Sequence, residues 1–176
     1  MVLVGFWISV TIKTVSKQKI ILILILLFSF VTRVWNLNYP KGYYFDEVYN
    51  AFTTREIAKG NRDAYEWFHP PENGTAYGLT HPPLAKLLAT VGIFVFGDNE
   101  FGWRISNALI GVGIIFLVYW IGKKLLDNEW ALVAAFFTSL DGLLLVQSRI
   151  NMNDIVATFF ILLVFYAYLK KNLLVL

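Results

Sequence analysis

Two adjacent carboxylates, Asp46 and Glu47, lie in the stretch YYFDEVYN shortly after a long apolar run. Charge is costly beside a bilayer, so acids in this place indicate a partner or a function. Asp46 could be a general base that takes a proton from a hydroxyl, or only the N-cap of a helix. Neighbouring side chains on a helix point roughly 100° apart. We therefore expect one acid to face a site and the other to face a structural partner.

Five further side chains could bind an anionic or polar ligand, namely His81, Lys86, Arg104, Arg149 and Asp154. His81 could contact a phosphate or orient a carboxylate, or it could form a rigid elbow with the two prolines that follow. Lys86 could neutralise a phosphate or extend to lipid headgroups. Arg104 could bind a phosphate through its guanidinium fork, or it could extend to lipid headgroups. The pattern alone favours a salt bridge or a helix cap for Arg149 and Asp154.

Composition limits the kinds of site. There is no Cys, which excludes thiolate metal sites and Cys nucleophiles. His69, His81, Asp46 and Glu47 could in principle bind a divalent metal, but no ligand-spacing motif predicts it. We predict no metal site, although a divalent ion stays open as a cofactor. The net charge of +3 includes no dense basic cluster, so nucleic acid is not an expected partner.

The elements that must position these residues are mostly membrane helices. Of the 176 residues, 57% are hydrophobic, compared with about 45–50% in soluble domains, and the excess lies in runs. We predict an all-α, polytopic integral membrane protein with about four transmembrane helices. The expected spans are residues 20–35, 102–122, 130–148 and 154–169, with Asp141 and Gly142 as a kink or early helix end in the third.

Basic residues predict the orientation. Lysines lie before the first span, after the second and after the fourth, so an even number of spans places all of them on one side. The positive-inside rule makes that side cytoplasmic. Residues 1–19 and 170–176 are then cytoplasmic, and the long loop of residues 36–101 is extracytoplasmic together with the turn at 149–154. Because polar groups gather at one end, the chain is expected to be a fragment of a larger bundle.

Two helices are predicted inside this loop, at about residues 46–59 and 84–96. The first starts at Asp46 and ends before Gly60, and Val48, Ala51, Phe52 and Ala58 give it an apolar stripe suited to a bilayer surface. The second is apolar but too short to span comfortably, which is typical of an interfacial or re-entrant helix.

Four motifs occur in order: FDEVY after the first span, THPPLAKLL late in the loop, GWRISNALIG opening the second span, and QSRINMND before the fourth. Together they resemble the N-terminal part of the dolichyl-phosphate-mannose–protein mannosyltransferases, within the C-type glycosyltransferase superfamily. The resemblance covers about residues 33–171. The related aminoarabinose transferases of lipid A are similar in plan, but typically have Lys-Pro-Pro where this chain has His81-Pro82-Pro83.

The resemblance implies an enzyme that transfers a sugar, expected to be mannose, from a polyprenyl phosphate to an acceptor hydroxyl. Transfer would occur with inversion on the extracytoplasmic side, to a protein Ser or Thr, or to a lipid or glycan as in the aminoarabinose enzymes. The resemblance implies that Asp46 is the catalytic base and that Glu47 supports it. It also implies that the donor phosphate is bound by Arg104, Arg149 and His81, and that Asp154 lies near the site. The membrane would be the plasma membrane of a prokaryote or the endoplasmic reticulum of a eukaryote. The rival hypothesis is a non-catalytic lipid-binding or scaffold fragment.

Overall fold

The computed structural model describes residues 16–71 and 75–172, and within these ranges every regular element is a helix. The predicted segments 1–19 and 170–176 therefore fall partly outside the described residues. The elements are α1 (Lys17–Val34), α2 (Glu47–Ala58), the short 3₁₀ helix η1 (Arg62–Tyr65), α3 (Leu84–Phe96), α4 (Glu100–Leu125), α5 (Asn128–Leu140), α6 (Gly142–Ser148) and α7 (Asn153–Asn172). The all-α prediction is confirmed.

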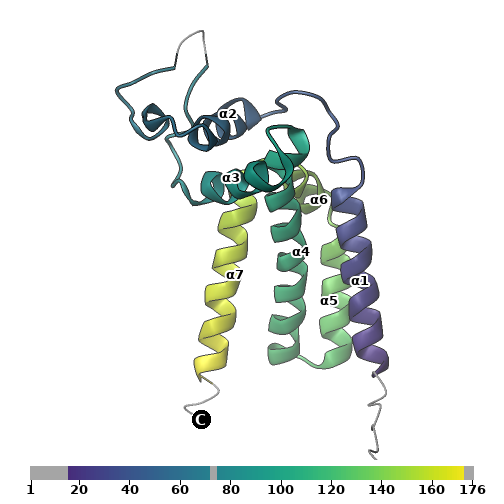
Figure 1. The fold of residues 1–176 in the computed structure, drawn as a ribbon. Coiled ribbons are helices and arrows are strands. Elements are labelled where there is room, and N and C mark those ends of the chain that lie inside the picture. The colour runs from purple at the N-terminus through teal and green to yellow at the C-terminus, as the bar shows by residue number, and fades with distance from the viewer. Residues whose placement is uncertain (1–15, 72–74, 173–176) are drawn as a thin grey trace, which may run out of the picture.

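The helices form two parts (Figure 1). Helices α1, α4, α5 and α7 run side by side, while α3 lies across their upper ends and α2 lies above α3. Helix α4 is the centre, because it contacts every other α-helix of the described chain. The loop helices therefore cover one end of a bundle whose opposite end holds the start of α1 and the last turns of α4 and α7.

Two described helices, Glu100–Leu125 and Asn153–Lys171, are long and apolar enough to cross a membrane. The pair Asn128–Leu140 and Gly142–Ser148, bent by 61°, would make a third if it is one span. Helix α1 has 18 residues and includes three basic residues, at its two ends. The count of four spans and their orientation stay predictions.

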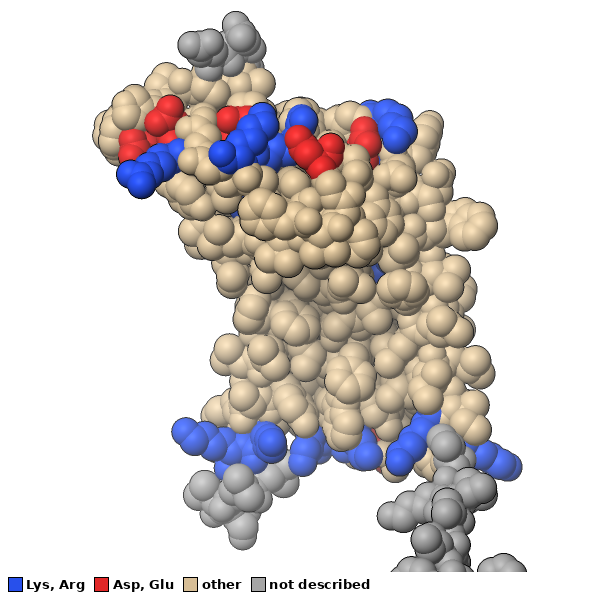
Figure 2. All heavy atoms as spheres, in the orientation of Figure 1, with Lys and Arg blue, Asp and Glu red and all other residues tan. Residues whose placement is uncertain are grey.

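Charge is segregated along the bundle (Figure 2). Lys and Arg gather at the lower end of the view, acidic and basic groups share the upper end, and the face between them is almost free of both. The lower end carries Lys17 at the start of α1, Lys123 and Lys124 in the last turn of α4, and Lys170 and Lys171 in the last turn of α7. This distribution is the one expected of a bundle placed across a bilayer.

The break between α5 and α6 lies at Asp141, where the kink was expected. Asp141 ends α5 in an extended backbone conformation, and its Oδ1 accepts a hydrogen bond of 2.6 Å from the Leu144 backbone N–H. A new helix starts there because the carboxylate satisfies a free amide of its first turn.

Helix α2 packs against α3 and α4, and its place on the bilayer surface stays a prediction. Its buried face is largely polar and packs on α3 and the start of α4; the buried residues are Glu47, Asn50, Ala51, Thr53 and Thr54. Val48 of the predicted stripe is exposed instead. Arg55 fastens α2 to the α3–α4 turn through two hydrogen bonds to Asp98, of 2.6 and 2.9 Å, and these bonds raise the pKa of Arg55.

Helices α3 and α4 approach closely where glycines face each other. A Cβ on Gly92 would overlap the backbone carbonyl oxygen of Gly102 and would lie 2.9 Å from the Ile105 Cγ2 atom. Only a residue without a side chain allows this approach.

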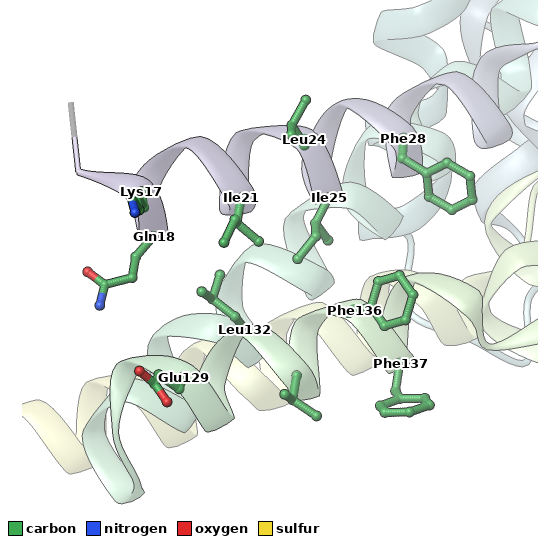
Figure 3. Close-up of a pocket in the computed structure, with 11 residues that line it drawn as sticks. Lys17, Gln18, Ile21, Leu24, Ile25, Phe28, Glu129, Leu132, Phe136 and Phe137 are labelled. Atoms are coloured by element: carbon green, nitrogen blue, oxygen red, sulfur yellow. The ribbon is translucent and has the colours of Figure 1, made fainter.

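An apolar groove of about 740 Å³ lies between α1 and α5 (Figure 3). Ile21, Ile25, Leu132 and Phe136 are among the residues that line it, and Lys17 and Glu129 lie at one end. Its lining carries no group suited to acid–base chemistry along its length, so the candidate chemistry lies at the end of the bundle covered by α2 and α3.

Candidate active site

The stretch YYFDEVYN forms the turn that leads into α2. Phe45 has φ of 55°, a left-handed conformation that is costly for a bulky residue, and it reverses the chain just before Asp46. Asp46 occupies the N-cap position of α2, yet its side chain makes no capping hydrogen bond. Within the described part of the chain its half-buried carboxylate has no hydrogen bond or ion pair. The geometry therefore does not support the hypothesis that Asp46 is only a cap.

Glu47, the next residue, is fully buried and accepts four hydrogen bonds. Its Oε1 accepts from Arg104 Nε at 2.8 Å and from the Asn151 backbone N–H at 3.0 Å. Its Oε2 accepts from an Arg104 terminal nitrogen at 2.6 Å and from the Tyr44 backbone N–H at 3.0 Å. The two acids thus differ as predicted, because one is free and the other is held by the protein.

Arg104 is the partner that holds Glu47. Its remaining N–H groups donate to three backbone carbonyls of the α1–α2 connection, those of Leu37, Pro40 and Gly42, at 2.9 to 3.1 Å. A guanidinium has five N–H donors, and all five are used here. The side chain is fully buried, and its described contacts leave no N–H group for the predicted phosphate or for lipid headgroups.

Three asparagines, missed in the sequence, join the α6–α7 turn to this cluster. Asn107 on α4 donates to the carbonyls of Ile150 and Met152 at 2.9 and 2.8 Å. Asn151 donates to the Thr54 hydroxyl at 3.3 Å, and Asn153 donates to Asn50 Oδ1 at 2.8 Å. The one signal in the sequence was that each of these asparagines lies within or beside an apolar run, where a side-chain amide needs a buried partner. We call Glu47, Arg104 and these three asparagines the polar node.

Arg149 lies at the outer end of α6, beside the upper end of α1. One of its terminal nitrogens donates to the carbonyls of Thr32 and Arg33, at 2.6 and 3.3 Å. It lines a cavity of about 400 Å³ together with Tyr39 and Tyr44. Burial and, secondly, the charge of Arg104 lower the pKa of Arg149.

Asp154 lies exposed in the first turn of α7 and forms no ion pair with Arg149 among the described residues. The salt bridge that the pattern favoured is therefore absent from this part of the chain. A carboxylate in the first turn is favourable for the helix dipole, so a structural role in α7 accounts for Asp154 by itself.

His81 and Lys86 line a third cavity, of about 160 Å³, between α2, η1 and the segment that leads into α3. His81 is exposed, and its Nδ1 lies 3.0 Å from the Thr80 hydroxyl. Lys86 is 2% exposed, and burial lowers its pKa. The structure thus brings these two predicted residues together, and it does so without Arg104.

The residues considered as metal ligands in the sequence do not form one cluster; these are His69, His81, Asp46 and Glu47. Within the described residues the cluster that could hold an ion consists of Asp63, Glu66 and His69, whose ligand atoms lie within 4.8 Å of one another. The cluster runs from η1 into the loop that follows it, and His69 Nδ1 lies 2.6 Å from Glu66 Oε2. The hydrogen bond between His69 and Glu66 accounts for the proximity of these two side chains without a metal.

Comparison with known proteins gives a consistent result. Residues 23–174 match the family described as dolichyl-phosphate-mannose-protein mannosyltransferase. A polyprenol-phosphate-mannose–protein mannosyltransferase of Corynebacterium glutamicum is 38% identical over 112 residues, which cover 60% of this chain and 22% of that protein. Its counterpart in Mycobacterium tuberculosis is 36% identical over 101 residues, covering 56% of this chain and 19% of that protein.

A more distant relative is protein O-mannosyl-transferase 1 of Mus musculus, which is 27% identical over 162 residues, covering 80% of this chain and 19% of the mouse protein. No solved structure matches. The aligned part of this chain spans about a fifth of the length of these relatives.

Proposed function

Because the chain belongs to the dolichyl-phosphate-mannose-protein mannosyltransferase family, we propose that it contains the catalytic end of a membrane glycosyltransferase. The reaction is the transfer of mannose from a polyprenyl phosphate to a hydroxyl group of a protein Ser or Thr. The relatives' names supply the donor and the protein acceptor. The site lies at the extracytoplasmic end of the bundle, in the plasma membrane or the endoplasmic reticulum.

One observation carries this proposal: a free carboxylate, Asp46, directly follows a strained turn and directly precedes a fully buried, fully bonded acid, Glu47. A carboxylate that is not occupied by the protein can accept a proton from a substrate hydroxyl. Glu47 cannot do so, since its oxygens already accept four hydrogen bonds. Asp46 is therefore the base, and Glu47 is a positioning residue that fixes the start of α2.

The transfer step balances as an inverting displacement. The acceptor oxygen forms a bond to the anomeric carbon of mannose from the face opposite the phosphate, and its proton passes to the Asp46 carboxylate. The bond between the anomeric carbon and the phosphate oxygen breaks, and the polyprenyl phosphate leaves with the electron pair. The protein contributes orientation of the two substrates and proton removal, for which a base typically provides about 10²–10⁴-fold in rate.

The position of the polar node suits these substrates. It lies where the bundle meets α2 and α3, so a lipid-anchored donor can approach from the bilayer and a polar acceptor from the water. A donor phosphate needs a cation at this level. Arg149, His81 and Lys86 are the candidates, since Arg104 has no free donor. Asp154, in the first turn of α7, is exposed and would lie near the site without binding the phosphate.

The test is transfer activity of the complete reading frame with polyprenyl-phosphate-mannose and a Ser/Thr peptide. Asp46→Asn is expected to lower kcat by about 10²-fold or more, with little change in donor affinity. Asp63→Asn, an exposed acid of η1 in the same loop, serves as the matched control. Equal kcat for Asp46→Asn and the unmutated protein would refute the role of Asp46, and no transfer with any polyprenyl-phosphate sugar would refute the enzyme.

A second function, lipid binding without catalysis, is favoured by the exposed apolar surface of α1 and α7 and by the groove beside α1. It predicts that polyprenyl phosphates bind and that no sugar leaves the donor. The same assay separates the two functions. A lipid or glycan acceptor, as in the aminoarabinose-type enzymes, would appear as transfer to lipid when the peptide is omitted.

A further inference from the structure

The groove between α1 and α5 is apolar along its length and polar at one end (Figure 3). Its volume of about 740 Å³ is within the range of roughly 300–1,000 Å³ that is usual for ligand sites. The polar end carries Lys17 and Gln18 of α1 and Glu129 of α5, and three phenylalanines line the opposite end. A ligand that fits this groove therefore has an apolar chain and a polar head.

The groove is as long as one leaflet of a bilayer. From Lys17 to Phe28 it follows three turns of α1, roughly 17 Å at about 1.5 Å per residue. The hydrocarbon core of a bilayer is about 30 Å thick, so a single leaflet supplies about half of that. A transmembrane helix of a partner would need a contact across both leaflets, whereas the acyl chain of a lipid stays in one. The length therefore favours a lipid as the occupant.

Two charges of opposite sign lie at the polar end. Lys17 and Glu129 are both exposed, and neither side chain forms an ion pair or a hydrogen bond within residues 16–71 and 75–172. An anionic head without an amine would be attracted by Lys17 and repelled by Glu129. A head that carries a phosphate and an ammonium group gives each of the two a partner of opposite charge.

The chemistry of Glu129 also selects the kind of amine. A carboxylate is only an acceptor of hydrogen bonds, and a primary ammonium group has three N–H donors. The quaternary ammonium group of a choline head has none. Trp130, next to Glu129, is 62% exposed, and an indole in this position is favourable at the level of lipid headgroups.

We propose that the groove binds a phospholipid with a primary amine, of the phosphatidylethanolamine type. One acyl chain lies between α1 and α5, the phosphate lies at Lys17 and the ammonium group at Glu129. The lipid belongs to the leaflet at the lysine-rich end of the bundle (Figure 2), opposite to the polar node. This site goes beyond the proposed transfer reaction and does not depend on it.

The test is native mass spectrometry of the complete reading frame in a neutral detergent. The probes form an equimolar mixture of dioleoyl phosphatidylethanolamine, dioleoyl phosphatidylcholine, dioleoyl phosphatidylglycerol and undecaprenyl phosphate. The unmutated protein is expected to retain the ethanolamine lipid about two- to fivefold more than each of the others, which is the factor that one exposed ion pair supplies.

Variants at the two charges test the head. Glu129→Gln should remove the preference for the ethanolamine lipid, because the amine then loses its charged partner. Lys17→Gln should lower the retention of all three phospholipids. Lys19→Gln, which removes an exposed lysine of α1 that does not line the groove, is the matched control and should retain lipid like the unmutated protein.

A variant of the groove tests the chain. Val133 lines the groove and is 40% exposed, so the larger side chain of Val133→Trp occupies space that the acyl chain needs. It should lose the bound lipid whatever the head. Leu27→Trp, at an exposed position of α1 outside the groove, is the matched control and should keep the lipid.

The outcomes decide between the possible occupants. Equal retention of the four lipids, or retention of the ethanolamine lipid that persists in Val133→Trp, would overturn the site. Stronger retention of the glycerol lipid or of undecaprenyl phosphate, or a dimer that Val133→Trp abolishes, would assign the groove to another occupant and overturn the proposal. Glu129→Gln changes an exposed residue and keeps the test valid if Val133→Trp does not fold, since an unchanged preference in Glu129→Gln would also overturn it.

Discussion

The polar node makes a strong prediction about Glu47. In Glu47→Gln the side chain keeps its shape and loses its charge and one of its two acceptor oxygens. Whichever way the new amide is turned, its NH₂ group faces two donors, because each oxygen of Glu47 accepts from Arg104 and from one backbone N–H. The guanidinium of Arg104 is then left buried with no carboxylate.

The size of the effect follows from burial. Both side chains are 0% exposed. Removal of one partner from a buried ion pair costs roughly 3–5 kcal/mol of unfolding free energy, because the other charge stays uncompensated. For a chain of this size 1 kcal/mol corresponds to roughly 2–4 °C. Glu47→Gln should therefore lower the melting temperature by about 10 °C.

The assay is thermal unfolding in detergent, followed by tryptophan fluorescence, with Glu66→Gln on the exposed loop as the control. A second variant, Glu47→Leu with Arg104→Met, removes both charges and should regain only part of the lost stability, because three backbone carbonyls and two backbone N–H groups then lose their partners. It should not regain transfer activity, since nothing then fixes the start of α2. A shift under 2 °C for Glu47→Gln would refute the argument that the pair is needed for the fold.

Three further predictions concern other positions. Gly92→Ala should lower the unfolding free energy by roughly 1–3 kcal/mol, because its Cβ would overlap the Gly102 carbonyl; an unchanged denaturation midpoint would contradict the close α3–α4 approach. Phe45→Gly should preserve or raise the melting temperature and Phe45→Val should lower it, since φ is 55° at that position; the reverse order in the same scan would exclude strain there. Burial lowers the pKa of Lys86 from its ordinary 10.5, so the unfolded chain binds more protons at alkaline pH and stability should rise as pH increases through the folded pKa toward 10.5. Melting temperatures measured from pH 7 to 10 should show this rise in the unmutated protein and not in Lys86→Met.

Local signals in the sequence predicted the helices of the outer loop well. The second loop helix, expected at residues 84–96, has those bounds in the structure, since two prolines precede it and Gly97 with φ of 89° follows it. The first was expected at residues 46–59 and is Glu47–Ala58 with both end residues as caps. The break at Asp141 was also visible, because an acid followed by glycine inside an apolar run disfavours a continuous helix.

The packing of α2 could not be read from the sequence. Its apolar residues suggested a bilayer surface, but threonines and asparagine form most of its buried face against α3. Such small polar residues are compatible with burial or exposure. Their environment is decided by the helix that packs on them, and that is a property of the tertiary fold.

The partner of Arg104 was hidden for a related reason. An Arg at the end of an apolar run predicts a buried partner or a ligand, and both a phosphate and a carboxylate satisfy a guanidinium fork. Glu47 is 57 residues away in the sequence, so no local pattern links the two. The asymmetry of the two acids was predicted from helix geometry, whereas the identity of the buried acid required the structure.

The residues of the polar node are also synthesised at different times. Glu47 receives Arg104 from a helix made 57 residues later and the Asn151 backbone from a turn made 104 residues later. At synthesis rates of roughly 5–20 residues per second, the second partner follows Glu47 by about 5–20 s. During that interval Glu47 lacks the backbone N–H of Asn151, so the polar node is incomplete. The start of α2 therefore reaches its final set of contacts only when the turn before α7 has been synthesised.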